Sequence, residues 1–402
     1  RRSAAFERFQ IADLPTEAEE VWRYSRIDEL DLAAYTPVPA GADGALPSEL
    51  EAVVGAVGDR AALVVVRNGH VHHVELDPAL AGRGVVVGSA GDIAGGEEMV
   101  GSVANGPDVF VDLATAFMAD PVVVRVPRGV AVERPVVVVH WMDAEGGAVF
   151  PRLVVQTGEA SQVSVLDHVA SAHGLPAFVA PVVELDAGDA SNLSYVGTQD
   201  LGRRVWQVGY QASRVARDAT LSSVLVALGG EYARVATDSR LEGLGGTSRL
   251  RALYFGDGVQ MHDFRTLQDH DAPKTTSDLL FKGAVEDESR AVYSGLIRIR
   301  KGAAGTNAFQ TNRNLVLTAG AHADSVPNLE IEENDVRCSH ASAVGPIDAD
   351  QRYYLEARGL PPDVADRLII LGFFEEIVEE IAITGLRQPL LQAVAAKLGE
   401  PA

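Results

Sequence analysis

The sequence has very little cysteine: Cys338 is the only one among 402 residues. One thiol cannot form an internal disulfide. Nor can it supply by itself the several thiolates of a structural zinc site or an iron–sulfur cluster. Any metal chemistry of this chain therefore needs ligands from elsewhere.

Long apolar runs and positive charge are also scarce. No run approaches the roughly 18 to 20 apolar residues that span a bilayer, and the start, Arg1-Arg2-Ser3, lacks the apolar core of a signal peptide. With 56 acidic and 34 basic residues, the net charge of -22 would repel phosphate backbones and anionic lipid headgroups. We expect a cytoplasmic protein with neither nucleic acid nor membrane as a partner.

Several catalytic motifs are missing. The chain has no GxxxxGK[ST] loop to cradle phosphates, and no GxSxG elbow or HExxH helix. We therefore do not expect it to hydrolyse ATP itself. Aromatic residues make up only 6%, while glycine is frequent with 39 residues, which indicates many turns and a β-rich chain.

The middle of the chain repeats a short turn at a nearly fixed interval. The copies begin with 129-GVAVERPVVVV, 158-GEASQVSVL, 188-GDASNLSYV, 217-RDATLSSVLV and 245-GGTSRLRALYF, at steps of 29, 30, 29 and 28 residues. Each turn precedes alternating polar and apolar residues, which is the period of a strand. A fixed period in this range is typical of a stacked repeat, so we predict a β-helix over 126–345 and keep a sandwich of hairpins as the alternative.

The two flanks of this core look different from it. Residues 1–125 predict a helical and mixed region, with a helix over 16–23, strands over 62–66 and 84–88, and a turn at Asn68-Gly69 before three histidines to which we assign no function. Further strands are expected over 291–300, 314–323 and 329–333. Residues 346–402 predict helices over 350–359, 362–381 and 386–399, the last of which starts or bends at Pro389.

One apolar stripe marks the long C-terminal helix, in which apolar residues recur at three- and four-residue steps. Its members are Val364, Leu368, Leu371, Phe374 and Val378. A repeat stack needs capped ends, so the stripe either packs on the last turn of the stack or seats a partner.

Two clusters could carry chemistry. In 334-NDVRCSH-340, alternation places Cys338 and His340 on one strand face with Cα atoms about 6.6 to 7 Å apart. Taken alone, the pair is more typical of packing than of a metal site. The stretch 261-MHDFRTLQDHDAP-273 contains imidazoles and carboxylates suited to metals, but its alternation sends His262 and Asp263 to opposite faces.

The C-terminal half resembles a known family. The runs 270-HDAPKTTSDLLFKGAVEDESRAVYSGLIRI-299, 309-FQTNRNLVL-317, 326-VPNLEIEENDVRCSHASAVGPID-348 and 353-YYLEARGL-360 are together similar to the SufB/SufD family of iron–sulfur cluster assembly scaffolds. The N-terminal 19-EEVWRYSRIDEL-30 resembles the opening of the SufD branch. Ala341 and Ser342 stand where the family usually shows Gly-Ala. The SufB branch carries a further sulfur-accepting thiol, which this chain lacks.

The resemblance implies a mainly β protein, a right-handed parallel β-helix flanked by an N-terminal α/β region and a C-terminal helical region. It implies a non-catalytic subunit that pairs with SufB along the β-helix and binds the SufC ATPase through the C-terminal helices, for which we name Leu371, Phe373 and Phe374. It also implies that a transient iron–sulfur cluster forms at the SufB–SufD interface, with His340 as an iron ligand and Cys338 beside it.

Two other functions remain open at this point. A carbohydrate-active β-helix enzyme would want clustered acids and exposed aromatics in a groove, usually in a secreted protein. A homodimeric scaffold that stores or passes iron would need no second kind of chain. The mass of the assembly formed with SufB and SufC would separate these functions.

Overall fold

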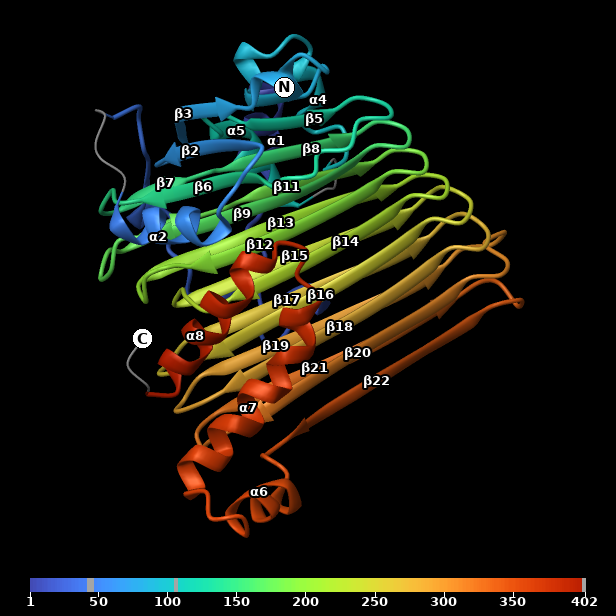
Figure 1. Ribbon diagram of the computed structural model, residues 1–402. Helices are drawn as coiled ribbons and strands as arrows, with labels where there is room; N and C mark the ends of the chain where they lie inside the picture. The colour runs from blue at the N-terminus through green and yellow to red at the C-terminus, as the bar shows by residue number, and fades with distance from the viewer. Residues whose placement is uncertain (42–46, 105–107, 400–402) are drawn as a thin grey trace.

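The protein is a flattened stack of β-strand coils with helices at its sides (Figure 1). The computed structural model describes residues 1–41, 47–104 and 108–399. Two sheets face each other, and the chain passes from one to the other and back at each turn of the stack. In each sheet the eight strands of the stack pair in parallel, from β5 to β21 in the first sheet and from β6 to β22 in the second. The predicted parallel β-helix is confirmed.

The strands of the first sheet, in spatial order, are β4 (Val86–Ser89), β5 (Val122–Val126), β8 (Arg152–Thr157), β11 (Val182–Ala187), β13 (Val205–Val215), β15 (Tyr232–Leu241), β17 (Met261–His270), β19 (Arg290–Ile299) and β21 (His322–Ile331), with β1 (Thr36–Pro37), β7 (Gly147–Val149) and β10 (Ala177–Val179) beside them. Those of the second are β3 (His70–Leu76), β2 (Ala62–Arg67), β6 (Val136–Met142), β9 (Gln162–Ser171), β12 (Asn192–Asp200), β14 (Thr220–Ala227), β16 (Thr247–Gly256), β18 (Thr276–Val285), β20 (Asn307–Val316) and β22 (Arg337–Gly345).

The repeated turn is the corner at which the chain leaves the first sheet. Ala160, Ala190 and Asp218 adopt left-handed backbone with φ of 53°, 53° and 54°. Their amides donate to carbonyl oxygens of the next corner along the stack, at 2.8 to 2.9 Å. The corner therefore repeats because each copy satisfies the backbone of its neighbour.

The interior changes along the stack. At the N-terminal end it is built from valine and leucine, such as Val124, Val138 and Leu153, contributed by both sheets. Toward the C-terminal end, tyrosine and amide side chains enter the interior, among them Tyr293 and Gln310. The stack is therefore apolar at one end and polar inside at the other.

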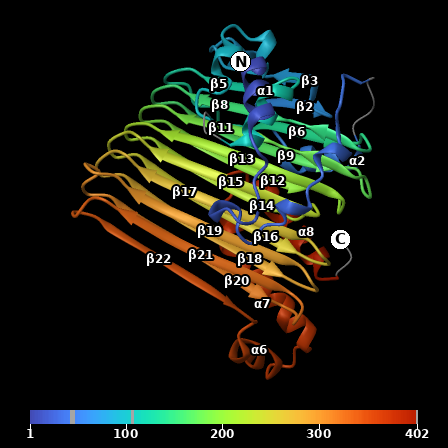
Figure 2. The same ribbon diagram turned by 180° about the vertical axis from the view of Figure 1, so that it is seen from behind.

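The N-terminal region contains α1 (Arg2–Ile11), α2 (Ser48–Val57), α3 (Pro78–Ala81), α4 (Gly96–Met99), α5 (Val109–Phe117) and the 3-10 turns η1 (Glu20–Trp22), η2 (Ile27–Glu29), η3 (Leu32–Ala34) and η4 (Ala90–Asp92). The helix predicted over 16–23 is wrong: only η1 forms there. This segment is a strap across the outer face of the first sheet (Figure 2). Arg234 lies 3.7 Å from the Trp22 ring centroid and donates to the Val21 carbonyl, so tertiary contacts override helix propensity.

The C-terminal region consists of α6 (Ala349–Glu356), α7 (Pro362–Glu379), the 3-10 turn η5 (Thr384–Leu386) and α8 (Arg387–Lys397). These confirm the three predicted helices, and Pro389 lies in the first turn of α8, where proline is tolerated. The long helices α7 and α8 lie on the outer face of the second sheet (Figure 1). The strand predicted over 314–323 is wrong, because β20 ends at Val316 and β21 begins at His322.

Candidate functional site at the open end of the stack

The last turn of the stack is the candidate site. It consists of β21 and β22, which pair with β19 and β20 on one side only. Cys338 lies opposite Ala308, and His340 opposite Gln310, in the register of β20 and β22. Ser342 of β22 donates to the Ser325 hydroxyl of β21 at 2.8 Å, so its side chain points into the space between the two sheets. Cys338 and His340 lie four and two residues away from Ser342 on the same strand, and alternation places them on the same inward face. They therefore lie two residues apart on the inward face of β22, at the open end of the stack.

The two residues differ in their surroundings. Cys338 is half-buried and packs on a small apolar cluster with Ile297, Ile299 and Ala308. Burial raises the pKa of its thiol, so the thiol form dominates at neutral pH and the residue is a poor nucleophile. Its environment in the isolated chain is one of packing.

His340 is exposed on the same face. Within the described part of the chain, its side chain has no hydrogen bond or ion pair. The same residues contain no group of three or more His, Cys, Asp or Glu side chains that could hold a metal ion. The last turn offers one imidazole and one adjacent thiol, which is fewer than the three groups counted for a metal site.

The second predicted cluster does not assemble. Asp263 is buried between Arg234 and Arg265, at 2.7 and 2.6 Å, and Asp269 pairs with Arg300 at 2.6 Å. The imidazole of His262 points to the Gly229 carbonyl at 3.1 Å instead. Alternation along β17 separates these groups, so the stretch serves packing and pairing.

The C-terminal residues named for a partner occupy different environments. Phe374 is fully buried against Phe255 of the second sheet, with ring centroids 6.4 Å apart. Leu371 and Phe373 are half-buried, and the Phe373 ring lies 4.8 Å from the Lys282 ammonium. Leu368, another member of the predicted stripe, is 48% exposed and so does not pack on the stack as Phe374 does. The Phe374 side chain cannot reach a partner unless α7 leaves the sheet.

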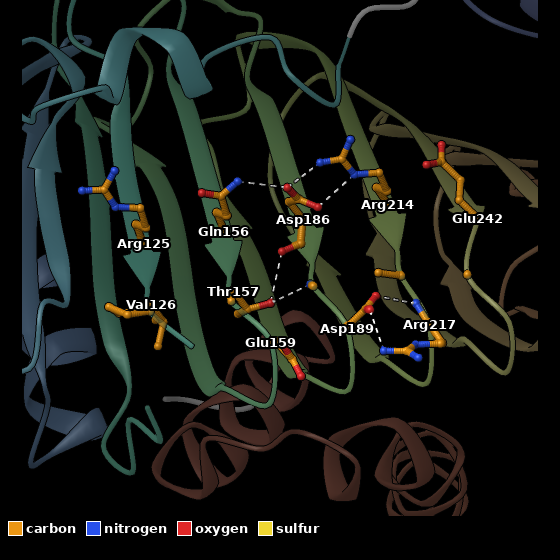
Figure 3. A pocket seen from close by; sticks show the side chains of 15 residues that line it. Arg125, Val126, Gln156, Thr157, Glu159, Asp186, Asp189, Arg214, Arg217 and Glu242 are labelled. Atoms are coloured by element: carbon orange, nitrogen blue, oxygen red, sulfur yellow. Dashed lines mark hydrogen bonds and ion pairs between the residues drawn. The ribbon is translucent and has the colours of Figure 1, made fainter. Parts of the chain in front are cut away.

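A groove of about 640 Å³ runs along the stacked corners that follow β5, β8, β11, β13 and β15 (Figure 3). Arg214 clasps Asp186 with two bonds of 3.0 and 2.7 Å, and Arg217 binds Asp189 at 2.9 Å. The lining contains neither histidine nor cysteine. Because its central charges are paired with one another and soft ligands are missing from its lining, the groove is not a site for iron or sulfide.

Comparison with known protein families decides the assignment. The family model described as "SUF system FeS cluster assembly, SufBD core domain" matches residues 140–373, and the "SufBD protein N-terminal region" model matches residues 1–138. The chain belongs to the SufBD family.

Named relatives of the SufBD family agree with this. An iron–sulfur cluster assembly SufBD family protein of Mycobacterium tuberculosis is 38% identical over 284 residues, which cover 68% of this chain and 70% of the relative. The SufD proteins of Escherichia coli and Bacillus subtilis are 27% and 25% identical over 96% and 97% of this chain, and over 89% and 92% of their own lengths. This nearly full-length similarity supports the SufD branch of the SufBD family. No described helix is long and apolar enough to cross a membrane.

Sequence reasoning missed the polar layer directly beneath the last turn. It consists of Tyr254, Tyr293, Gln310, Asn312 and Asn314, all at most 4% exposed. Alternation within 310-QTNRN-314, combined with the repeat of about 30 residues, would have placed its amides in one column with His340. Sequence analysis uses this stretch only as one of the motifs of the family resemblance and makes no prediction of its burial.

Proposed function

We propose that the chain is a non-catalytic, cytoplasmic scaffold subunit of a SufBCD complex, in which it pairs with SufB and binds SufC. The carrying observation is the open last turn, where His340 has no side-chain partner within residues 1–41, 47–104 and 108–399 and faces the end of the stack beside Cys338. A nascent cluster is the cargo of this site. Imidazole nitrogen and thiolate sulfur are both iron ligands, and the partner chain would supply the remaining ones.

The edge of β22 supports pairing with a second β-helix. Edge strands usually carry charges or proline that prevent pairing. β21 carries Pro327 in its middle and two carboxylates, Asp324 and Glu330, whereas Arg337 is the only Asp, Glu, Lys or Arg residue of β22 and no proline interrupts it. The nine residues of β22 therefore form an unprotected edge, which suits strand addition from SufB.

The surface of α6 and α7 suits a second partner. Tyr353 and Tyr354 of α6 are 72% and 57% exposed, and Leu368 of α7 is exposed beside the half-buried Leu371 and Phe373. Tyrosine is one of the residue types enriched among interface hot spots, and exposed leucine beside it adds apolar area that a partner can bury. We propose that SufC binds this surface and that its ATP hydrolysis acts on the last turn through α7. Phe374 supports the surface from beneath.

The proposal is tested by mixing the full chain with SufB and SufC and measuring the mass of the assembly by light scattering. A stable assembly containing all three chains is expected. A chain that remains alone, or that forms only a homodimer in the presence of both partners, contradicts the proposal. The family assignment makes a carbohydrate-active enzyme the weaker alternative, since its members are iron–sulfur cluster assembly proteins.

The role of His340 is tested in the assembled complex. His340→Ala should abolish most cluster formation from iron and sulfide, measured by absorption and by iron content. His322→Ala is the matched control, because His322 is also exposed, lies on the last turn, and faces outward. Equal cluster formation by both variants would remove His340 from the site.

A further inference from the structure

The side chain beneath His340 is held in one orientation. Gln310 is 1% exposed and lies directly opposite His340 in the parallel register of β20 and β22. Its Oε1 accepts a hydrogen bond from the Tyr293 hydroxyl at 3.1 Å, and its Nε2 donates to the Asn328 carbonyl at 3.2 Å. Tyr293 is in turn bonded to Thr266 at 3.2 Å. Both ends of the amide are therefore fixed.

Glycine makes room for this arrangement on each sheet. A Cβ at Gly295 would overlap the Tyr293 hydroxyl and crowd Gln310 Oε1. A Cβ at Gly283 would overlap the ring of Tyr254, which donates to Asn314 at 2.7 Å in the other half of the layer. Two glycines that accommodate two tyrosine–amide pairs indicate a built feature and not a packing accident.

Burying this polar layer costs more desolvation free energy than burying an apolar core of the same size. The opposite end of the same stack is filled with valine and leucine, which stabilise without the desolvation of amides and hydroxyls. A fully bonded polar network fixes its members in place instead. Its position directly beneath the open end points to a role in orienting the groups of the last turn.

The Oε1 atom of Gln310 can accept one more hydrogen bond, and His340 is suited to donate it. A carbonyl oxygen accepts two hydrogen bonds, and Tyr293 occupies one. The His340 side chain makes no hydrogen bond within the described residues, but adjacent parallel strands lie about 4.8 Å apart, so a rotation of this side chain brings a ring N–H within reach of the second direction. Histidines that bind metals usually donate their other ring N–H to an oxygen, which fixes the tautomer.

Resting on the role proposed for His340, we propose that Gln310, held by Tyr293, is the positioning residue of this imidazole. After rotation of the exposed His340 side chain from its orientation in the structure, where it has no hydrogen bond within the described residues, the Oε1 of Gln310 accepts the N–H of one ring nitrogen of His340. The second ring nitrogen is thereby left unprotonated and turned toward the open end, where it can bind iron. Gln310 itself does not touch the cargo.

The test measures the tautomer of His340 in the full chain without iron, by long-range nitrogen-15 spectra of histidine-labelled protein at pH 8. Removing the acceptor in Gln310→Leu should change the ratio of the two tautomers by about fivefold, as expected for one net hydrogen bond. Tyr293→Phe should shift it in the same direction, because the amide loses its anchor. The signal is assigned by its loss in His340→Gln.

Tyr254→Phe is the matched control. This substitution removes a hydroxyl of equal burial from the same layer. The amide partners of Tyr254, however, are Asn312 and Asn314, which lie opposite Ser342 and Val344 and not opposite His340. A comparable fall in melting temperature with an unchanged tautomer ratio is expected.

An unchanged ratio in both Gln310→Leu and Tyr293→Phe, or an equal shift in Tyr254→Phe, overturns the proposal. If His340→Ala abolishes cluster formation while Gln310→Leu leaves the ratio unchanged, the positioning role alone fails. If the ratio shifts but His340→Ala has no effect on clusters, the proposed function fails.

Discussion

At the scale of single residues, position in the stack decides chemistry. Cys338 and His340 are two residues apart on one strand face, yet the thiol packs on an apolar cluster while the imidazole is open. Histidines deeper in the stack behave differently again. Burial lowers the pKa of His168, His262 and His270 to about 4, mainly because the charged imidazolium loses its hydration.

These buried histidines predict an acid-sensitive fold. Their pKa values are lower in the folded than in the unfolded chain, where they are near 6.5, so the unfolded state binds more protons between pH 6.5 and 4. Stability is therefore complete above pH 6.5 and falls as the pH drops toward 4, by about 1.4 kcal/mol per pH unit for each group. Urea unfolding at several pH values measures this slope.

Two variants test whether the dependence of unfolding free energy on pH comes from the buried histidines. His270→Asn removes one buried imidazole, which bonds Thr275 and Ser277 at 2.8 Å, and should make the dependence on pH shallower. His322→Asn removes an imidazole whose side chain is 64% exposed and should leave the slope unchanged. Identical slopes for both variants and the unmodified chain would contradict this assignment.

At the scale of elements, α7 has two faces with separate tasks. Ile370, Phe374 and Ile377 pack on the second sheet, and the buried Lys282 ammonium is bonded to Glu376 and to the Phe373 carbonyl at 2.7 Å. Arg251 reaches Glu380 at 2.8 Å. The helix is thus clasped to the sheet by apolar contacts and by ion pairs, while Leu368 remains on the outer face.

Two truncations separate these tasks. Phe374→Ala should cost about 3 to 5 kcal/mol of unfolding free energy, because it opens a cavity in the interface between helix and sheet. Leu368→Ala should change stability by less than about 0.5 kcal/mol but weaken SufC binding about fivefold or more. Thermal unfolding and titration calorimetry measure the two effects. Equal losses of stability in the two variants, or unimpaired SufC binding by Leu368→Ala, would show that the two faces of α7 do not have these separate roles.

At the scale of the whole molecule, the stack is asymmetric. Its N-terminal end is covered by antiparallel strands β3 and β4, which end the two sheets. At the other end, β21 and β22 are the outermost strands of the two sheets, and Val326, Ile331 and Val344 are exposed there. A solenoid needs a cap on its last turn. Here the turn that no further described strand covers is also the turn that carries Cys338 and His340.

Hydrogen exchange measures whether a partner completes this end. The amides on the free edge of β22 should exchange rapidly in the isolated chain and become protected when SufB is added, because strand addition gives them acceptors. Amides of β14, which pairs on both sides, serve as the internal control and should not change. Protection that appears on α7 but not on β22 would place the SufB interface elsewhere.

Much of the fold could be predicted because local patterns repeat. The steps of 28 to 30 residues follow from corners that bond to one another, so each turn of chain needs nearly the same length. The error at 16–23 arose because acidic residues and a possible cap resemble a helix start, whereas the contact between Trp22 and Arg234 holds this segment on the sheet as a strap with short 3-10 turns. No local signal reports a contact across more than two hundred residues.

The sequence by itself determined the strand period, the repeat, the helical C-terminus and the shortage of metal ligands, since each depends on composition or on neighbours along the chain. Only the tertiary structure decided that Cys338 is packed and His340 is open, that Phe374 is buried and Leu368 is not, and that Gln310 lies beneath the imidazole. These outcomes depend on which turn of the stack comes last, and burial and register are set by neighbours in space.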